Sequence, residues 1–190
     1  MLQRRQLHQA LLAAPFAALL GACGQADSPR PQPIAADQAF DTVAAEGRGF
    51  SVGAITAART VQVLFDPQCP HCSHLWQAAL PLLGQARFVW LPVAFISPKS
   101  LPQGAALLQA ANPLETMNAH EQSLLAGGGG MAASSSVPAE IEAAIQRNTQ
   151  LLGRLGAESV PFIVARRGGQ PVLHAGALDT AGLRALLGLS

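Results

Sequence analysis

Cysteine and charge are both scarce in this chain. It has three cysteines among 190 residues, and only 12% of the residues are charged. Three cysteines are too few for a four-cysteine zinc site. The basic residues do not form the clustered positive face that a nucleic-acid partner requires, so we expect no such partner. The length suits one domain with a substantial core and is too short for two ordinary domains.

The N-terminal apolar run is too short to be a comfortable transmembrane helix, which needs about 20 residues. This run, residues 10–20, follows Arg4 and Arg5 and ends in small residues before Cys23. A charged start, a short apolar stretch and a small-residue cleavage site describe an export signal, so we expect residues 1–22 to be a signal peptide. Its removal leaves ten basic and eleven acidic residues, a net charge of −1.

The residues Leu20-Gly21-Ala22-Cys23 resemble the bacterial lipobox, whose cysteine is acylated and becomes the first residue of the mature protein. The alternative is ordinary cleavage, which would leave Cys23 as a free thiol. The cysteine count favours lipidation, because it leaves two thiols for a redox pair and no unpaired thiol in an oxidising compartment. Gly24 resembles the second residue of lipoproteins passed on to the outer membrane. We therefore expect a periplasmic protein that lipid at Cys23 anchors to a membrane.

Residues 23–36 have the composition of an extended tether. Three prolines fall within this short stretch, and a proline-rich segment is extended rather than packed. We therefore expect the folded domain to comprise residues 37–190.

The motif Cys69-Pro70-His71-Cys72 carries the chemistry. It follows the apolar run 61–65 and opens a helical pattern. The first turn of a helix has unpaired N–H groups and partial positive charge, which favour the thiolate form of Cys69. Cys72 lies one turn further on the same face, where it can attack a mixed disulfide at Cys69. The motif predicts a redox pair in which Cys69 is the exposed nucleophile and Cys72 the shielded, resolving thiol.

Three other interpretations of the two thiols remain open. They could form a static disulfide, remain as two buried thiols, or bind a metal together with His74. A set of Cys69, Cys72 and His74 needs a fourth ligand from elsewhere in the chain. Thiolates suit Cu(I), so the alternative function is a copper-binding envelope lipoprotein or metallochaperone.

The periodicity of the chain predicts an α/β domain with a mixed sheet. Pro92 should place its strand at an edge or break it, and Pro81 should kink or end its helix. The expected strands are residues 49–52, 61–65, 87–96, 162–165 and 172–175, and the expected helices are 37–48, 70–83, 102–111, 113–126, 138–155 and one near the C-terminus.

Residues 100–137 form a predicted helical insertion. In its helix 113–126 we expect His120 on the solvated face, and the glycines 127–130 read as a flexible loop without visible chemistry. The residues expected on the buried face of that helix are Leu114, Met117, Leu124 and Leu125.

The order of elements, the Cys-Pro-His-Cys motif and Val160-Pro161 before a strand all resemble the thioredoxin fold. In that family the proline at this place is cis and packs against the active-site cysteines. Only a bond before proline adopts cis at modest cost. The resemblance therefore implies a cis bond between Val160 and Pro161 and makes Pro161 part of the site.

Two segments, residues 65–72 and 89–95, resemble the catalytic domain of the DsbC/DsbG family of periplasmic disulfide isomerases. Those isomerases are dimers with an N-terminal dimerisation domain, whereas only residues 23–48 precede the catalytic region here, so we expect a monomer. Val160 and the Pro-His dipeptide instead match the DsbA oxidases. His71 would stabilise the Cys69 thiolate and hence the reduced state.

The resemblance implies an exported thiol:disulfide oxidoreductase that needs no cofactor. Its partners would be periplasmic protein substrates with cysteines and a membrane protein that recycles the pair. An extended substrate segment would bind beside Val160 and Pro161 through backbone hydrogen bonds. Both directions of electron flow, a DsbG-like reductase or isomerase and a DsbA-like oxidase, follow from the motifs.

Overall fold

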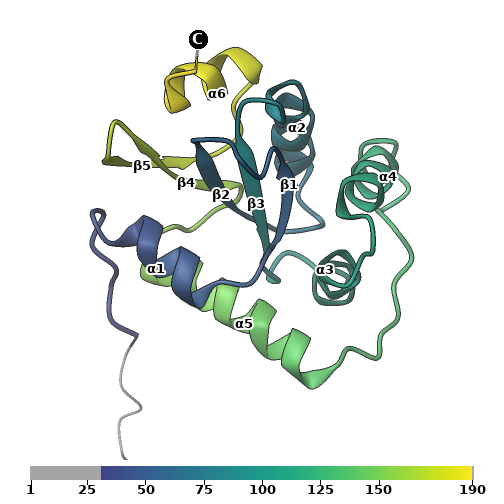
Figure 1. Ribbon diagram of the computed structural model, residues 1–190. Coiled ribbons are helices and arrows are strands. Elements are labelled where there is room, and N and C mark those ends of the chain that lie inside the picture. The colour runs from purple at the N-terminus through teal and green to yellow at the C-terminus, as the bar shows by residue number, and fades with distance from the viewer. Residues whose placement is uncertain (1–30, 190) are drawn as a thin grey trace, which may run out of the picture. The chain divides into compact units, whose positions relative to one another are not determined.

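A mixed five-stranded sheet lies at the centre of the residues that the computed structural model describes, 31–189 (Figure 1). Strands β2 and β3 are parallel, and the other neighbouring pairs are antiparallel. This confirms the predicted α/β, thioredoxin-like fold. The predicted signal peptide and Cys23 lie outside the described residues. In the order β1-β3-β2-β4-β5, the strands are Phe50–Gly53, Arg87–Pro92, Thr60–Phe65, Phe162–Arg167 and Gln170–Ala175.

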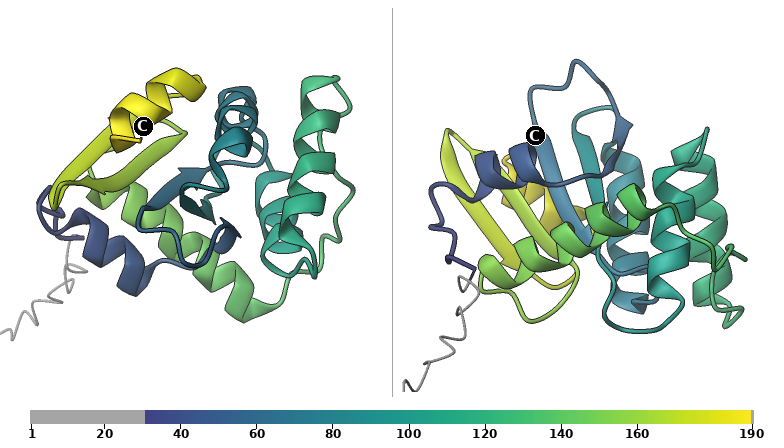
Figure 2. Two further views of the ribbon diagram at one scale, coloured as in Figure 1. Left: turned by 45° about the horizontal axis from the view of Figure 1, so that its top comes forward. Right: turned by 90° about the horizontal axis from the view of Figure 1, so that it is seen from below.

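Helices cover both faces of the sheet. Figure 1 and Figure 2 show α1 and α5 on one face and α2 and α6 on the other. The insertion helices α3 and α4 pack against α5 and α2, respectively. None of the helices in the described part of the chain is long and apolar enough to cross a membrane. The helices are α1 (Ala39–Glu46), α2 (Pro70–Ala79), α3 (Ser100–Leu108), α4 (Pro113–Leu125), α5 (Ala139–Arg154) and α6 (Thr180–Leu187).

The two prolines that the sequence marked as breakers both end an element. Helix α2 gives way at Leu80–Leu82 to a short 3₁₀ turn that contains Pro81. Strand β3 ends at Pro92 rather than continuing to residue 96. It is not an edge strand, because it pairs with both β1 and β2. Proline closes the strand without leaving a backbone N–H unpaired.

An aromatic cluster joins the sheet to α2. The rings of Phe65 and Trp90 meet edge to face with centroids 5.4 Å apart, and those of Trp76 and Trp90 are 5.1 Å apart. Each such pair contributes about 0.5–1.5 kcal/mol beyond the area it buries. The Trp76 indole N–H donates to Asn118 Oδ1 at 2.8 Å, so the same cluster also attaches α4 to α2. Contacts with the sheet and with α4 therefore both fix the position of α2.

Helix α4 buries Met117, as the sequence predicted, but two polar residues are buried with it in place of Leu114 and Leu125. Leu114 and Leu125 are 38% and 44% exposed, whereas His120 and Glu121 are fully buried. The expectation of a solvated His120 was wrong because both of its ring nitrogens have backbone partners. Nε2 lies 2.7 Å from the Pro67 carbonyl oxygen, and Nδ1 accepts from the Met131 N–H at 3.1 Å. With those bonds made, burial of the imidazole carries little cost.

The last residues of the predicted tether are attached to the domain. The Ile34 N–H donates to the Arg154 carbonyl at 2.8 Å, and Arg154 Nε donates to the Gln32 carbonyl at 3.1 Å. Ile34 also packs against the apolar core. Residues 32–34 therefore lie against the C-terminal end of α5.

Candidate active site

The site begins where β2 ends and α2 starts. Cys69 precedes the helix with an extended backbone, and Pro70 follows at the first helical position. Proline suits this position because the N–H that it lacks would have no partner within the helix. The Cys72 N–H donates to the Cys69 carbonyl at 2.9 Å. The spacing thus places the two thiols one turn apart at the N-terminus of α2.

Both cysteines are free thiols and both are well covered. Cys69 is 4% exposed and Cys72 is 0% exposed. Cys69 is more covered than we expected because the loop before β4 lies against it. In the thiol form its Sγ donates to the Val160 carbonyl at 3.5 Å. The bond between Val160 and Pro161 is cis, as the resemblance implied.

The surroundings separate the acidities of the two thiols. A hydrogen bond from the Cys72 thiol, backbone N–H groups and the charge of His71 lower the pKa of Cys69 to about 6, against an opposing effect of burial. Burial raises the pKa of Cys72 well above its usual value, and the charges of Cys69 and Glu121 raise it further. At neutral pH the pair therefore consists of a thiolate at Cys69 and a thiol at Cys72.

Asp66, which the sequence did not single out, shapes the loop before Cys69. Its Oδ1 accepts from the Gln68 N–H at 2.9 Å and from the Ser100 hydroxyl at 2.6 Å. Its Oδ2 accepts from the N–H groups of Phe95 and Ile96 at 3.0 and 3.1 Å. Four donors satisfy this fully buried carboxylate, which joins the redox loop to α3 and to the loop after β3. Its position directly after the strand was the available signal.

The glycine-rich loop is fastened to the site rather than free. The Gln68 side-chain amide donates to Gln103 Oε1 at 2.6 Å and to the Gly129 carbonyl at 2.9 Å. The Gln103 amide donates to the Gly129 and Met131 carbonyls at 2.9 and 2.8 Å. Gly130 has a φ of +83°, and a Cβ there would lie 2.4 Å from the His120 ring. Gly130 is therefore needed for the close approach of this loop to His120, which reasoning from composition missed.

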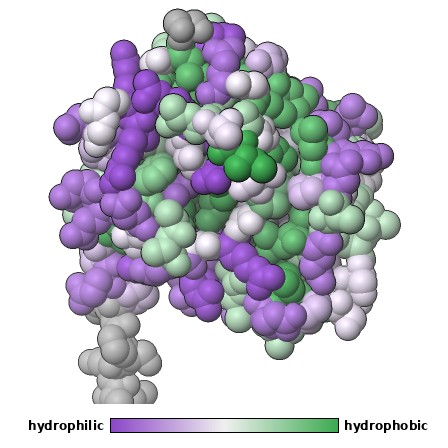
Figure 3. All heavy atoms as spheres, viewed as in Figure 1, coloured by the Kyte–Doolittle hydropathy of each residue, from purple (hydrophilic) through white to green (hydrophobic). Residues whose placement is uncertain are grey.

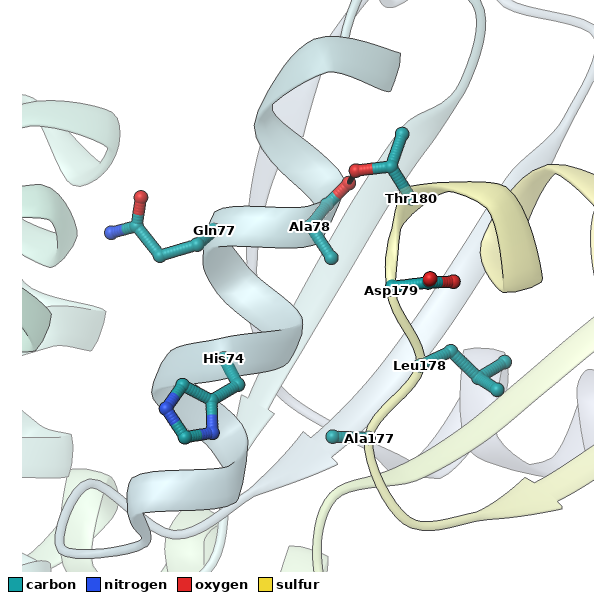
Figure 4. A pocket seen from close by; sticks show the side chains of 7 residues that line it. All are labelled: His74, Gln77, Ala78, Ala177, Leu178, Asp179 and Thr180. Carbon is teal, nitrogen blue, oxygen red and sulfur yellow. Dashed lines mark hydrogen bonds between the residues drawn. The ribbon is translucent and has the colours of Figure 1, made fainter.

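His71 and His74 lie on the exposed side of α2, with their ring centroids 6.3 Å apart. His74 lines a pocket of about 450 Å³ between α2 and the loop before α6, together with Ala78, Leu178 and Asp179 (Figure 4). Within residues 31–189 no group of three or more histidine, cysteine or acidic side chains is placed to hold a metal ion. The alternative ligand set of Cys69, Cys72 and His74 is thus not assembled.

Glu121 is a second residue that the sequence reasoning missed. Its Oε2 is hydrogen bonded to the hydroxyl of Ser73, the residue after Cys72. Burial raises the pKa of Glu121 to about 8, and the charge of Cys69 adds to the effect. The signal was its spacing, because Glu121 follows the buried Met117 by four residues and so shares its face of the helix.

The comparisons with known proteins agree with this geometry. No family model matches the sequence. The chain is 31% identical over 117 residues to the thiol:disulfide interchange protein DsbG of Pseudomonas aeruginosa, a match that covers 58% of this chain and 43% of the relative. The chain thus spans less than half the length of that relative.

Solved structures match the fold over most of the chain. The catalytic domain of Proteus mirabilis ScsC is 18% identical with a TM-score of 0.64, covering 80% of this chain and 96% of that one. A thioredoxin-like oxidoreductase from Silicibacter pomeroyi is 18% identical with a TM-score of 0.59, covering 78% and 95%. The chain therefore has a thioredoxin-like fold and is similar, over 117 residues of its sequence, to the thiol:disulfide interchange protein DsbG.

Proposed function

We propose that this protein is an exported thiol:disulfide oxidoreductase that exchanges disulfides with periplasmic proteins through Cys69 and Cys72. The observation that carries the proposal is the placement of two free thiols one helical turn apart at the N-terminus of α2, with the first beside the Val160 carbonyl. The name of the curated relative, a thiol:disulfide interchange protein, supports the same activity.

The reaction runs in two exchange steps. The Cys69 thiolate attacks a substrate disulfide, forming a mixed disulfide and releasing one substrate thiolate. The Cys72 thiolate then attacks Cys69 Sγ, which closes the Cys69–Cys72 disulfide and releases the second substrate thiolate. Two electrons pass from the pair to the substrate, and the reverse sequence oxidises a substrate dithiol. A pKa of about 6 keeps Cys69 mostly ionised at neutral pH, ready for the first step.

Neighbouring groups support these steps. His71 stabilises the Cys69 thiolate by its charge and its backbone N–H. The Val160 carbonyl lies beside the Cys69 sulfur, so an extended substrate segment bound along Val160 and Pro161 would present its disulfide to Cys69. The side chains of Phe95 and Ile96, 49% and 46% exposed, offer apolar contacts on the loop that Asp66 holds.

The surface also suits a polypeptide substrate. Figure 3 shows hydrophilic residues around the margin of one face, and apolar residues toward its middle and upper right. Helix α2 lies in the same part of this view in Figure 1. An exposed apolar patch with a polar rim is typical of surfaces that bind other molecules.

The proposal extends to the location of the protein in the cell and to its partners. The lipobox resemblance supports an acyl anchor at Cys23, and Gly24 supports delivery to the outer membrane. Two or three acyl chains at one residue give stable anchoring, because each buried methylene contributes about 0.8 kcal/mol. We propose that the protein works as a monomer and that a membrane protein recycles its cysteine pair. The reduction potential of the pair, measured with its redox state in cells, decides the direction of electron flow.

Trapping of mixed disulfides tests the function. A Cys72→Ala variant expressed with its export signal should accumulate disulfide-linked complexes with other proteins, because resolution is blocked. A Cys69→Ala variant should accumulate few, because the nucleophile is absent. Non-reducing gels followed by mass spectrometry of the excised bands measure both. Equal numbers of complexes in the two variants, or none in either, would contradict the proposal.

A further inference from the structure

Five arginines gather at the end of the sheet remote from the redox loop, which we call the arginine end. Strands β2 and β3 begin there and β4 finishes there, because Thr60 pairs with Arg87 and Val61 with Ala165. Strand β2 runs from this end toward Cys69, over about 20 Å at roughly 3.3 Å per residue. The five are spread along the sequence from position 59 to position 184, so only the fold brings them together. They are Arg59, Arg87, Arg166, Arg167 and Arg184.

Hydrogen bonds show that these arginines are neighbours in space. The Arg87 N–H donates to the Arg59 carbonyl at 2.9 Å. The Arg167 guanidinium donates to a carbonyl in the last turn of α6 at 3.1 Å, and Arg184 of that helix donates to Gln85 Oε1 at 3.1 Å. Arg167 is exposed and the others are partly exposed. The arginine end is thus a continuous surface formed by strands and by α6.

The positive charge of this surface is only partly offset. Asp41 of α1 forms an ion pair with Arg166 at 2.6 Å. Arg59, Arg87 and Arg167 form no ion pair within residues 31–189. The chain after residue 22 carries a net charge of −1. The arginine end is therefore a local positive surface on a protein whose net charge is slightly negative, and it favours an anionic partner.

Two of the arginines line a hollow of about 330 Å³. Arg59 and Arg166 contribute to its wall together with Phe40, Thr60 and Gly169. The Arg166 guanidinium lies over the Phe40 ring, 4.9 Å from its centroid, which holds it against α1. Guanidinium groups bind phosphate through pairs of N–H donors. The hollow therefore has the donors and the room for a phosphate group with a small substituent.

We propose that the arginine end docks on an anionic phospholipid surface, with a lipid phosphate in the hollow between Arg59 and Arg166. The proposal rests on the proposed export and acyl anchor and is independent of disulfide exchange. Phe40, which lines the hollow, belongs to α1, the first helix after the predicted tether. Figure 2 shows the turn between β4 and β5 beside the chain that leads into α1. A chain anchored at Cys23 therefore joins the folded domain on the side of the docking surface.

Docking in this way sets the orientation of the redox site. Because β2 leads from the arginine end to the loop before α2, Cys69 faces away from the lipid and toward proteins in solution. The acyl chains supply the lasting attachment to the membrane, and the arginines decide which side of the domain faces it. Electrostatic attraction of this kind weakens as salt screens the charges.

Vesicle binding tests the arginine end without the acyl anchor. The protein is the mature chain carrying Cys23→Ser, produced without residues 1–22. Vesicles of phosphatidylglycerol and phosphatidylethanolamine should sediment it at low salt, and vesicles of phosphatidylcholine should not. Arg59→Gln combined with Arg166→Gln should weaken binding about 25-fold, since each basic residue near an anionic surface contributes about fivefold. Salt at about 0.5 M should abolish binding.

A matched pair of substitutions controls for net charge. Arg48→Gln combined with Arg147→Gln removes the same charge from exposed positions beside Asn148 of α5. This control should leave vesicle binding unchanged. Equal weakening by the two pairs would show that net charge, and not the arginine end, attracts the lipid. Equal binding to phosphatidylcholine vesicles would overturn the electrostatic basis of the proposal.

Titration with inorganic phosphate separates a lipid from a soluble ligand. If calorimetry detects phosphate binding while neither kind of vesicle binds, the hollow serves a soluble phosphate compound and lipid docking is wrong. None of these outcomes bears on disulfide exchange, which the Cys72→Ala trap tests separately.

Amide hydrogen exchange covers the case in which the arginine variants do not fold. In protein with all five arginines, phosphatidylglycerol vesicles should slow exchange in residues 166–170 and leave residues 66–72 unchanged. Slower exchange in the redox loop with none at residues 166–170 would contradict the proposed orientation.

Discussion

The two cysteines of this site show how position alone gives two identical side chains different pKa values. Cys69 at the start of α2 receives hydrogen bonds from the Cys72 thiol and from backbone N–H groups, and it lies near His71. Cys72, three residues later, is fully buried, and burial raises its pKa, with a smaller effect from negative charge on Glu121. The N-terminal position and the spacing were legible in the sequence. The contribution of Glu121 was not, because it arrives from a helix some fifty residues away.

The buried acid makes a prediction about stability and pH. Burial raises the pKa of Glu121 to about 8, above the value of about 4.3 in an unfolded chain, so the folded state favours the protonated form. The stability it contributes is fully present below about pH 4 and is lost as the pH rises through about 8.

We therefore expect wild-type protein to lose stability relative to Glu121→Gln between pH 5 and 8, by up to about 1.4 kcal/mol for each pH unit. Urea unfolding of both reduced proteins measures the difference, and titration of Cys69 is common to the two. Unfolding free energies that run parallel across this range would show that Glu121 does not titrate with folding.

At the scale of elements, three segments distant in the sequence hold the redox loop. The loop after β3 and the start of α3 bind Asp66, and the glycine-rich loop after α4 binds Gln68. Helix α4 itself reaches the loop through His120 and the Pro67 carbonyl. The helical insertion is therefore a support for the active site as well as a lateral extension of the domain.

Asp66→Ala should lower the free energy of unfolding by about 3 kcal/mol or more, because four buried donors lose a charged acceptor. Chemical denaturation measures the loss. Asp37→Ala, at an exposed position, is the matched control and should change stability by no more than about 0.5 kcal/mol. A similar loss in both variants would remove the special role given to Asp66.

Gly130→Ala should also destabilise the protein, by about 1–3 kcal/mol, since its φ of +83° and the nearby His120 ring leave no room for a Cβ. The same substitution at Gly84, which has open space around it, serves as control. Thermal unfolding of the two variants tests this. Equal melting temperatures would mean that the glycine-rich loop accommodates a Cβ at position 130 without loss of stability.

At the scale of the whole molecule, the fold was predictable and part of the site was not. The strands, the redox helix and its break near Pro81 follow from local patterns that depend on neighbours along the chain. The strand at Pro92 was predicted to break or lie at an edge, and it breaks while lying inside the sheet. Its position depends on the pairing of distant strands, which no local pattern specifies.

The misjudged face of α4 has the same origin. Counting apolar residues placed Leu114 and Leu125 inside and His120 outside, whereas the structure reverses them. The polar side chains are buried because backbone groups of the redox loop and of the loop after the helix satisfy them. A buried polar network is set by partners that the sequence alone does not bring together.

The central claim, that Cys69 is an activated nucleophile paired with a shielded Cys72, is tested most directly by alkylation of reduced protein across pH. Iodoacetamide followed by peptide mass spectrometry reports the rate at each cysteine. Cys69 should react first, with a rate whose midpoint lies near pH 6, and Cys72 should remain unmodified over the same range. Labelling of Cys72 first, or a midpoint near the value of about 8.5 for an ordinary thiol, would contradict the account.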